Sequence, residues 1–119
     1  MAARTFRDLV AWQEAMKLTE LIYRKTSKLP GNEAYGLMSQ MRRAAISIPS
    51  NIAEGAGRNT RGELMQFIGI ARGSLAELDT QLELGVRLGY FENGTECERQ
   101  LGRVGRLLTG LRKSLWNKK

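Results

Sequence analysis

Residues 47–55 read SIPSNIAEG and gather side chains whose types could do chemistry. The stretch combines two serine hydroxyls, an asparagine amide and a glutamate carboxylate, which are groups used in general acid–base and nucleophilic catalysis. In a catalytic interpretation Glu54, or Glu77 further along the chain, would be the acid or base, but nothing supplies the nucleophile that it would activate. Residues 55–57, Gly-Ala-Gly, form only a weak phosphate-loop pattern, because no strand precedes them and no Lys-Ser/Thr pair follows.

The composition of the chain weighs against catalysis. None of the 119 residues is a histidine, which removes the commonest general base, the commonest metal ligand and every Ser-His or Cys-His pair. Cys97 is the only cysteine, so it can form neither an intramolecular disulfide nor a cysteine metal cluster by itself. We therefore expect no enzyme activity, no catalytic residue, no metal site and no cofactor. A structural role for residues 47–55 is favoured over a binding role, and a binding role over a catalytic one.

Neither export nor membrane insertion is predicted from the sequence. No apolar run approaches the roughly 20 residues that a bilayer-spanning helix needs. The opening residues 1–12, MAARTFRDLVAW, lack the apolar segment and the small-residue cleavage site of a secretion signal. With a single cysteine, a reducing cytoplasm is the simplest setting, so we expect a cytoplasmic protein with no membrane partner.

The net charge of +7 is unevenly spread along the chain. Residues 1–28 carry a net charge of +3 and residues 95–119 carry +5, whereas residues 32–57 are neutral and residues 60–90 carry −1. Positive charge concentrated at the two ends of the chain is what a localised polyanion-binding face would look like. The alternative is that Lys and Arg simply keep two helices soluble.

A helical period runs through the whole chain, and no alternating strand pattern of useful length occurs. The sequence predicts one all-α domain spanning residues 1–119. Its predicted helices cover about 5–27, 32–56, 60–90 and 95–116, and their predicted N-caps are Thr5, Asn32, Thr60 and Thr95. Apolar residues in the last two helices recur at alternating spacings of three and four, and the connections are short. These features predict an antiparallel up-down-up-down four-helix bundle.

Pro49 stands inside the second predicted helix. It removes an N–H and crowds the carbonyl of Ala45, so we predict a kink near Pro49, with the hydroxyls of Ser47 and Ser50 serving the unpaired backbone groups. Polar side chains beside an apolar seam need hydrogen-bonded partners, in this bundle or in another subunit. We therefore predict a structural polar layer that fixes helix register. Its members are Ser47, Asn51 and Glu54 on the second helix and Ser74, Glu77 and Gln81 on the third.

Cations recur along one side of the fourth predicted helix. The predicted nucleic-acid-binding residues are Arg99, Arg103, Arg106 and Lys113, spaced i, i+4, i+7 and i+14, together with a smaller cluster of Arg42 and Arg43. Arg112, Lys118 and Lys119 extend the basic end of the helix. No aromatic residue is interleaved with the stripe, so base stacking and sequence readout are not supported. We expect salt-sensitive binding of RNA or DNA without strong sequence specificity.

A second hypothesis is a protein–protein interaction or adaptor module with no direct nucleic-acid binding. Its anchors would be aromatic residues, which dominate interface energetics. The candidates are Trp12, Tyr23, Phe91 and Trp116. For Trp12 we favour packing in the core or between subunits. In either hypothesis the apolar seams and polar layers exceed what one bundle would bury, which predicts a homo-oligomer of two to six chains.

Residues 44–55, AAISIPSNIAEG, followed by Arg58, resemble the signature of the four-helix bundle 23S rRNA intervening-sequence protein family. Residues 6–12, 37–43, 70–78 and 81–82 are similar to it as well, so that the resemblance covers about residues 5–91. It implies a bacterial protein and carries over no catalytic residue. The chain is also similar to the accessory variability determinant of diversity-generating retroelements. That similarity implies a homopentamer, nucleic acid as a ligand and, by analogy only, a reverse transcriptase as a partner.

Overall fold

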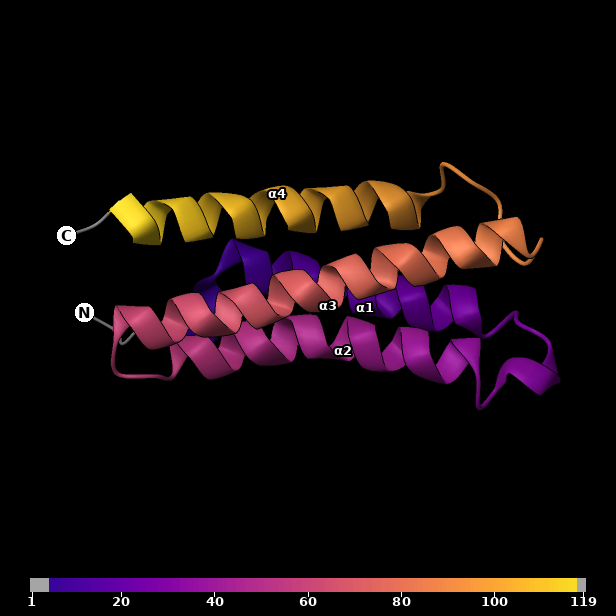
Figure 1. The fold of residues 1–119 in the computed structure, drawn as a ribbon, viewed down its shortest axis with the longest axis horizontal. Helices are drawn as coiled ribbons and strands as arrows, with labels where there is room; N and C mark the ends of the chain where they lie inside the picture. The colour runs from indigo at the N-terminus through magenta and orange to yellow at the C-terminus, as the bar shows by residue number, and fades with distance from the viewer. Residues whose placement is uncertain (1–4, 118–119) are drawn as a thin grey trace.

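Four long helices make up the fold in the computed structural model, which describes residues 5–117. They are α1 (Val10–Thr26), α2 (Leu37–Ala56), α3 (Arg61–Arg87) and α4 (Glu96–Asn117), and the short 3-10 helices η1 (Phe6–Asp8) and η2 (Gly31–Glu33) precede α1 and α2. The chain runs back and forth along a body measuring 48 × 22 × 21 Å, so the first and last described residues lie at the same end (Figure 1). The predicted all-α up-down-up-down bundle is confirmed.

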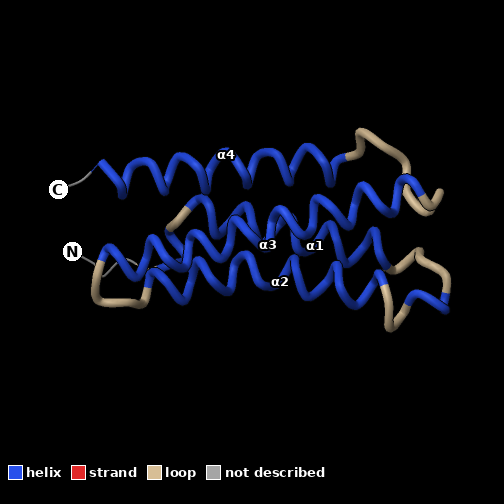
Figure 2. Tube along the Cα trace, in the orientation of Figure 1, coloured by secondary structure: helices blue, strands red, loops and turns tan. Residues whose placement is uncertain are grey.

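Each helix packs against two others, because α1 and α3 both contact α2 and α4 (Figure 2). The core between them is apolar. Its largest fully buried apolar side chains are Leu18, Ile22, Met41, Ile48, Ile52, Ile68, Leu78, Leu82, Val104 and Leu108. Each such side chain contributes about 1.5–3 kcal/mol by leaving water. Among residues 5–117 there is no strand, and no helix combines the length and apolarity that crossing a bilayer requires.

Two of the predicted threonine caps form with their side chains, although Thr5 caps a different helix from the expected one. Thr5 Oγ1 accepts the Arg7 N–H at 3.1 Å and caps η1, so α1 itself begins later, at Val10. The Thr60 cap is confirmed, since its Oγ1 accepts the Glu63 N–H of α3 at 3.1 Å. At the start of α4 the Thr95 carbonyl accepts the Arg99 N–H at 3.3 Å.

The predicted Asn32 cap is wrong. Asn32 lies in η2, and α2 begins five residues further on, at Leu37. The carboxylate of Glu33 takes the capping role, with Oε1 accepting the Leu37 N–H at 3.1 Å, which also places negative charge at the positive end of the helix dipole. Oε2 of the same carboxylate accepts the Tyr90 hydroxyl at 2.9 Å, a bond that raises the pKa of Tyr90. Glu33 therefore joins the start of α2 to the loop after α3.

Pro49 lies inside α2, which continues as helix from Leu37 to Ala56. The proline leaves the carbonyl of Ala45 without its usual N–H partner. Thr19 of α1 lies within reach, because its Oγ1 is 3.1 Å from the Ala45 oxygen and 2.9 Å from the oxygen of its own Ala15. A neighbouring helix thus offers a donor for the carbonyl that the proline orphans. The kink near Pro49 stays a prediction.

Gly55 explains why residues 47–55 end in a glycine. A Cβ at this position would lie 2.8 Å from Phe67 Cβ, 3.1 Å from Leu64 Cδ1 and 3.3 Å from the Leu64 carbonyl oxygen. The first of these distances is shorter than side-chain contacts allow. The absent side chain therefore lets α2 and α3 approach closely at this point, which supports the structural interpretation of the stretch.

Candidate nucleic-acid interface

The amphipathic pattern of α4 positions the predicted cations. Its buried side, which consists of Cys97, Leu101, Val104 and Leu108, faces the core. The four stripe residues Arg99, Arg103, Arg106 and Lys113 are all exposed. Spacings of seven and fourteen are near whole numbers of helical turns, so the predicted cations share the outer side of the helix.

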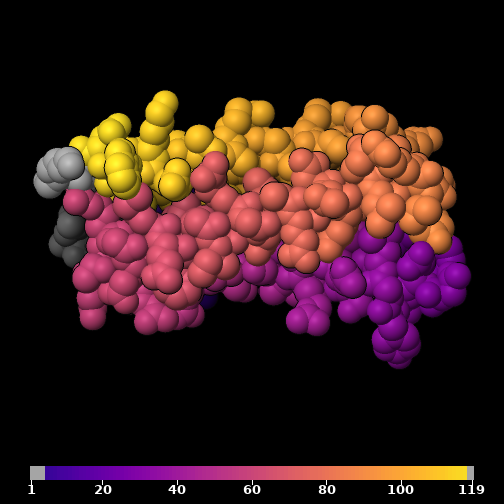
Figure 3. Space-filling view, viewed as in Figure 1, coloured from indigo at the N-terminus to yellow at the C-terminus, as the bar shows by residue number. Residues whose placement is uncertain are grey.

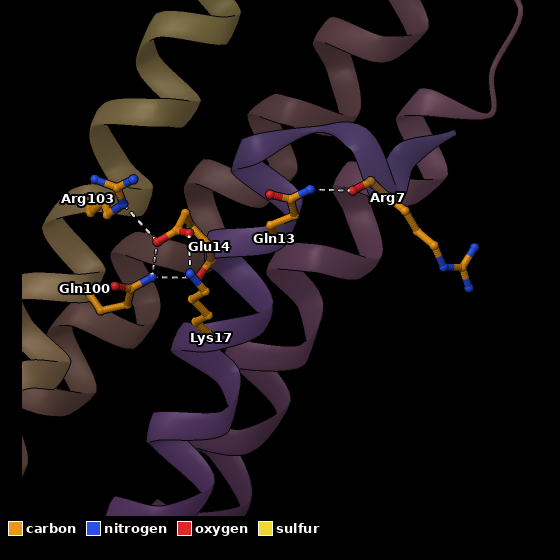
Figure 4. A network of polar contacts seen from close by, with 6 residues as sticks. All are labelled: Arg7, Gln13, Glu14, Lys17, Gln100 and Arg103. Atoms are coloured by element: carbon orange, nitrogen blue, oxygen red, sulfur yellow. Dashed lines mark hydrogen bonds and ion pairs between the residues drawn. The ribbon is translucent and has the colours of Figure 1, made fainter. Parts of the chain in front are cut away.

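Arg103 is engaged by a buried carboxylate that sequence reasoning missed. Its Nε donates to Glu14 Oε1 at 2.8 Å, and Gln100 Nε2 donates to the same oxygen at 3.0 Å and to the Glu14 carbonyl at 2.9 Å (Figure 4). Lys17 Nζ lies 3.0 Å from the other carboxylate oxygen. The hydrogen bond from Gln100 and the contacts with Lys17 and Arg103 lower the pKa of Glu14 to about 2.

This network fixes α4 against α1. Glu14 is only 7% exposed, and a buried carboxylate without partners would be costly. The adjacent Gln13 points elsewhere and donates to the Arg7 carbonyl at 2.8 Å, which ties η1 to α1 (Figure 4). The signal that could have revealed Glu14 is its place on the apolar face of α1, one turn before Leu18. Among the described residues, Arg103 is thus the one stripe cation that pairs with a carboxylate.

The Arg42–Arg43 pair divides between two environments. Arg42 Nε donates to Thr26 Oγ1 at 2.9 Å, Nη2 donates to the Tyr23 carbonyl at 3.1 Å, and the guanidinium lies 4.4 Å from the Tyr23 ring centroid. Arg42 therefore serves the carboxyl-terminal end of α1, where a cation also favours the helix dipole. Arg43 is exposed beside a hollow between α2 and α3.

The other described cations of α4 are not paired with a carboxylate. Arg99 Nη1 donates to the Gly94 carbonyl at 3.1 Å, while Arg106, Arg112 and Lys113 are exposed. Within residues 5–117, none of these four side chains forms an ion pair. Lys118 and Lys119 lie outside the described residues.

A groove between α3 and α4, here called the α3–α4 groove, brings further cations to this region. Its larger part has a volume of about 660 Å³ and is lined by Arg72 and Asp79 of α3 and by Arg106 and Lys113 of α4. Small residues line it as well, namely Ala76, Gly102, Gly105 and Gly110. A second part of about 380 Å³ shares Arg72 and Lys113 with the first and adds Trp116. Figure 3 draws this face, with the yellow-orange surface of α4 lying along the salmon surface of α3.

The predicted polar layer is brought together only in part. Ser47 and Ser74 oxygens lie 2.7 Å apart across α2 and α3, and Asn51 Nδ2 donates to the Ser47 carbonyl at 2.7 Å and to its hydroxyl at 2.9 Å. The predicted bonds from Ser47 and Ser50 to the backbone carbonyl left unpaired by Pro49 are not seen among the described residues: the Ser47 hydroxyl contacts Ser74 and Asn51, and Ser50 is exposed.

The other three members of the layer form no hydrogen bond with one another among the described residues. Glu54 forms a surface ion pair with Arg58 at 2.8 Å, and Glu77 is exposed at a polar hollow of about 360 Å³ between α2 and α3. Gln81 is buried, and its Oε1 has no hydrogen-bond partner among the described residues. No group of three or more His, Cys, Asp or Glu side chains in residues 5–117 could hold a metal ion.

The aromatic residues differ sharply in exposure. Trp12 packs against the core and meets Phe6 edge-on, with ring centroids 5.2 Å apart, as the packing interpretation expects. Phe91 also packs against the core, and its ring centroid lies 4.9 Å from Lys25 Nζ. The Phe91 ring occupies the space that a Cβ at Gly85 would need. Trp116, in contrast, is 70% exposed.

A protein-family model described as 23S rRNA-intervening sequence protein matches residues 7–110. The fold is similar to the crystal structure of a protein with unknown function from the S23 ribosomal protein family from Bacteroides thetaiotaomicron VPI-5482. The TM-score is 0.67 at 21% identity, over 89% of this chain and 94% of that chain, a likeness that shows the fold alone. No curated protein matches the sequence.

Proposed function

The chain belongs to the 23S rRNA-intervening sequence protein family, and from that premise we propose that it is a non-catalytic, homo-oligomeric scaffold that binds RNA or DNA through its basic faces. The observation that carries the proposal is the positive charge on α4. Arg106, Arg112 and Lys113 are exposed and form no ion pair within the described residues. Arg72 of α3 lines the same groove.

Cations of this kind suit phosphates rather than a particular sequence. Each phosphate that a Lys or Arg neutralises releases condensed counterions, so affinity arises without base contacts and weakens with salt. Contacts to phosphate position a nucleic acid on the protein but do not read its sequence. The net charge of +7 adds long-range attraction for any polyanion.

Exposed apolar side chains support the oligomeric part of the proposal. Ile70 and Leu84 of α3 and Leu88, which directly follows α3, are 45%, 47% and 53% exposed, and spacings of fourteen and four residues place them on one side of the helix. A second copy of the chain would cover such a face. In a closed ring the α4 cations would repeat around the assembly and multiply the basic surface. A pentamer is the assembly that the family resemblance implies.

The test is fluorescence anisotropy with labelled single- and double-stranded RNA and DNA, titrated from about 50 to 200 mM salt. We expect micromolar or tighter binding that falls steeply over this range. The triple variant Arg106→Gln, Arg112→Gln, Lys113→Gln should weaken binding and reduce the slope of log affinity against log salt by roughly two to three.

The matched control is Arg87→Gln, which removes an exposed cation that is paired with Glu83 near the other end of α3. Its affinity should stay close to that of the wild type. If the triple variant binds as tightly as the wild type, α4 is not the interface. If the wild-type protein binds no probe even at low salt, the nucleic-acid function is wrong and the adaptor hypothesis takes its place.

A further inference from the structure

Trp116 is an exposed aromatic side chain on the wall of the α3–α4 groove. It lines the part of the groove that also contains Arg72, Arg112 and Lys113. Trp116 follows Arg112 by four residues and Lys113 by three, so it lies one helical turn from both. Arg72 comes from the neighbouring helix, and this is why the sequence pattern of α4 alone does not reveal the cluster.

The fold gives Trp116 no structural task that the described residues reveal. The preceding Leu115 packs against the core, whereas Trp116 is 70% exposed. The other tryptophan, Trp12, is packed against Phe6. Tryptophan combines a large apolar ring with an N–H and is enriched at binding interfaces, so an exposed tryptophan beside three cations is a candidate contact for a ligand.

Single-stranded nucleic acids have the chemistry that this arrangement fits. Proteins that bind them combine a positively charged groove for the backbone with aromatic side chains on which bases stack. The bases of a duplex already stack on one another, whereas an unpaired base offers its flat face to the protein. The small residues Ala76, Gly105 and Gly110 keep the groove open between the two helices.

We propose that the α3–α4 groove prefers single-stranded RNA or DNA, with Trp116 stacking on an unpaired base while Arg72, Arg112 and Lys113 hold the neighbouring phosphates. This inference rests on the proposed nucleic-acid function and adds the strand preference to it. Asp79 also lines the groove, about 10 Å along α3 from Arg72. Because its carboxylate repels phosphate, we do not expect the strand to extend past Asp79. The strand therefore occupies the end of the groove near Trp116.

The experiment compares Trp116→Ala with the wild-type protein, using labelled oligothymidylate and oligouridylate of about 20 nucleotides and a duplex of the same length. Loss of the ring should weaken binding of both single strands by about tenfold and leave duplex affinity unchanged. Trp116→Phe, which keeps an aromatic face, should retain most of the single-strand affinity. In a Trp12→Phe background, where Trp116 is the only tryptophan, the single strands should quench its fluorescence and the duplex should not.

The outcomes separate this inference from the proposed function. If Trp116→Ala leaves single-strand affinity unchanged while the wild type still binds in a salt-sensitive way, the stacking site is overturned and the scaffold function stands. An equal loss for single strands and duplex also overturns the strand preference. If the wild type binds none of the probes, the proposed function and this inference both fail.

Discussion

Glu14 is a residue whose charge the fold depends on. Its carboxylate is buried between α1 and α4, where hydrogen bonding by Gln100 and contacts with Lys17 and Arg103 lower its pKa from the ordinary value of 4.5 to about 2. A pKa that is lower in the folded than in the unfolded state means that the ionised form stabilises the fold. This stabilisation is complete above about pH 4.5 and is lost as the pH falls toward 2.

Replacement of this carboxylate should therefore change stability and its pH dependence together. We expect Glu14→Gln to lower the free energy of unfolding at neutral pH by about 1.5–3 kcal/mol, the usual worth of hydrogen bonds to a charged group. In the wild type, protonation of Glu14 lowers the free energy of unfolding between pH 5 and pH 2. We expect a smaller decrease over this range in the variant, measured by urea unfolding. Glu20→Gln, an exposed change on the same helix, is the control. Identical pH profiles for Glu14→Gln and the wild type would contradict this role.

The hydroxyl of Thr19 in α1 lies within hydrogen-bond distance of the α2 carbonyl that Pro49 leaves unpaired. Thr19→Val removes the hydroxyl that can serve the Ala45 carbonyl, and we expect a loss of about 1–3 kcal/mol because a backbone acceptor is left unpaired. In a Pro49→Ala background the restored N–H can bond to Ala45, so the same Thr19 change should cost less. A double-mutant cycle by chemical unfolding measures the coupling. Equal costs of Thr19→Val in the two backgrounds would show that the residues act independently.

The helices could be predicted from the sequence more completely than their caps and the contacts between them. The helices could be predicted because apolar spacing determines which face each helix buries. The start of α2 was missed, since the cap is the carboxylate of Glu33 rather than the side chain of Asn32. The helical period of the sequence was enough to place the stripe cations on the outer side of α4. It could not show that Arg103 meets Glu14, because that depends on which turns of α1 and α4 face each other.

For the whole molecule, the face of α3 that carries the exposed side chains of Ile70 and Leu84 is the one on which the proposed oligomer depends. The double variant Ile70→Glu, Leu84→Glu places charge on two exposed positions of this face, where burial against another copy would then be strongly unfavourable. We expect light scattering at micromolar concentration to give an oligomer for the wild type and a mass near the 13.3 kDa of one chain for the variant. Met16→Glu, at a 40% exposed apolar position on α1, should leave the oligomer intact. A monomeric wild type would contradict the oligomeric proposal.

The connecting loops at the two ends of the bundle differ in how closely they pack against the helices. At one end Tyr90 bonds to Glu33 and Phe91 packs over Gly85, so the loop after α3 is anchored to the helices around it. At the other end residues 57–60, which join α2 to α3, are all exposed. Backbone amides of residues 57–60 should exchange their hydrogens with solvent sooner than those of the anchored loop after α3, because residues 57–60 are all exposed. Since the carboxyl-terminal half of α4 lies there too (Figure 1), the part of the proposed groove near Trp116 lies at the end of the bundle where we expect faster exchange.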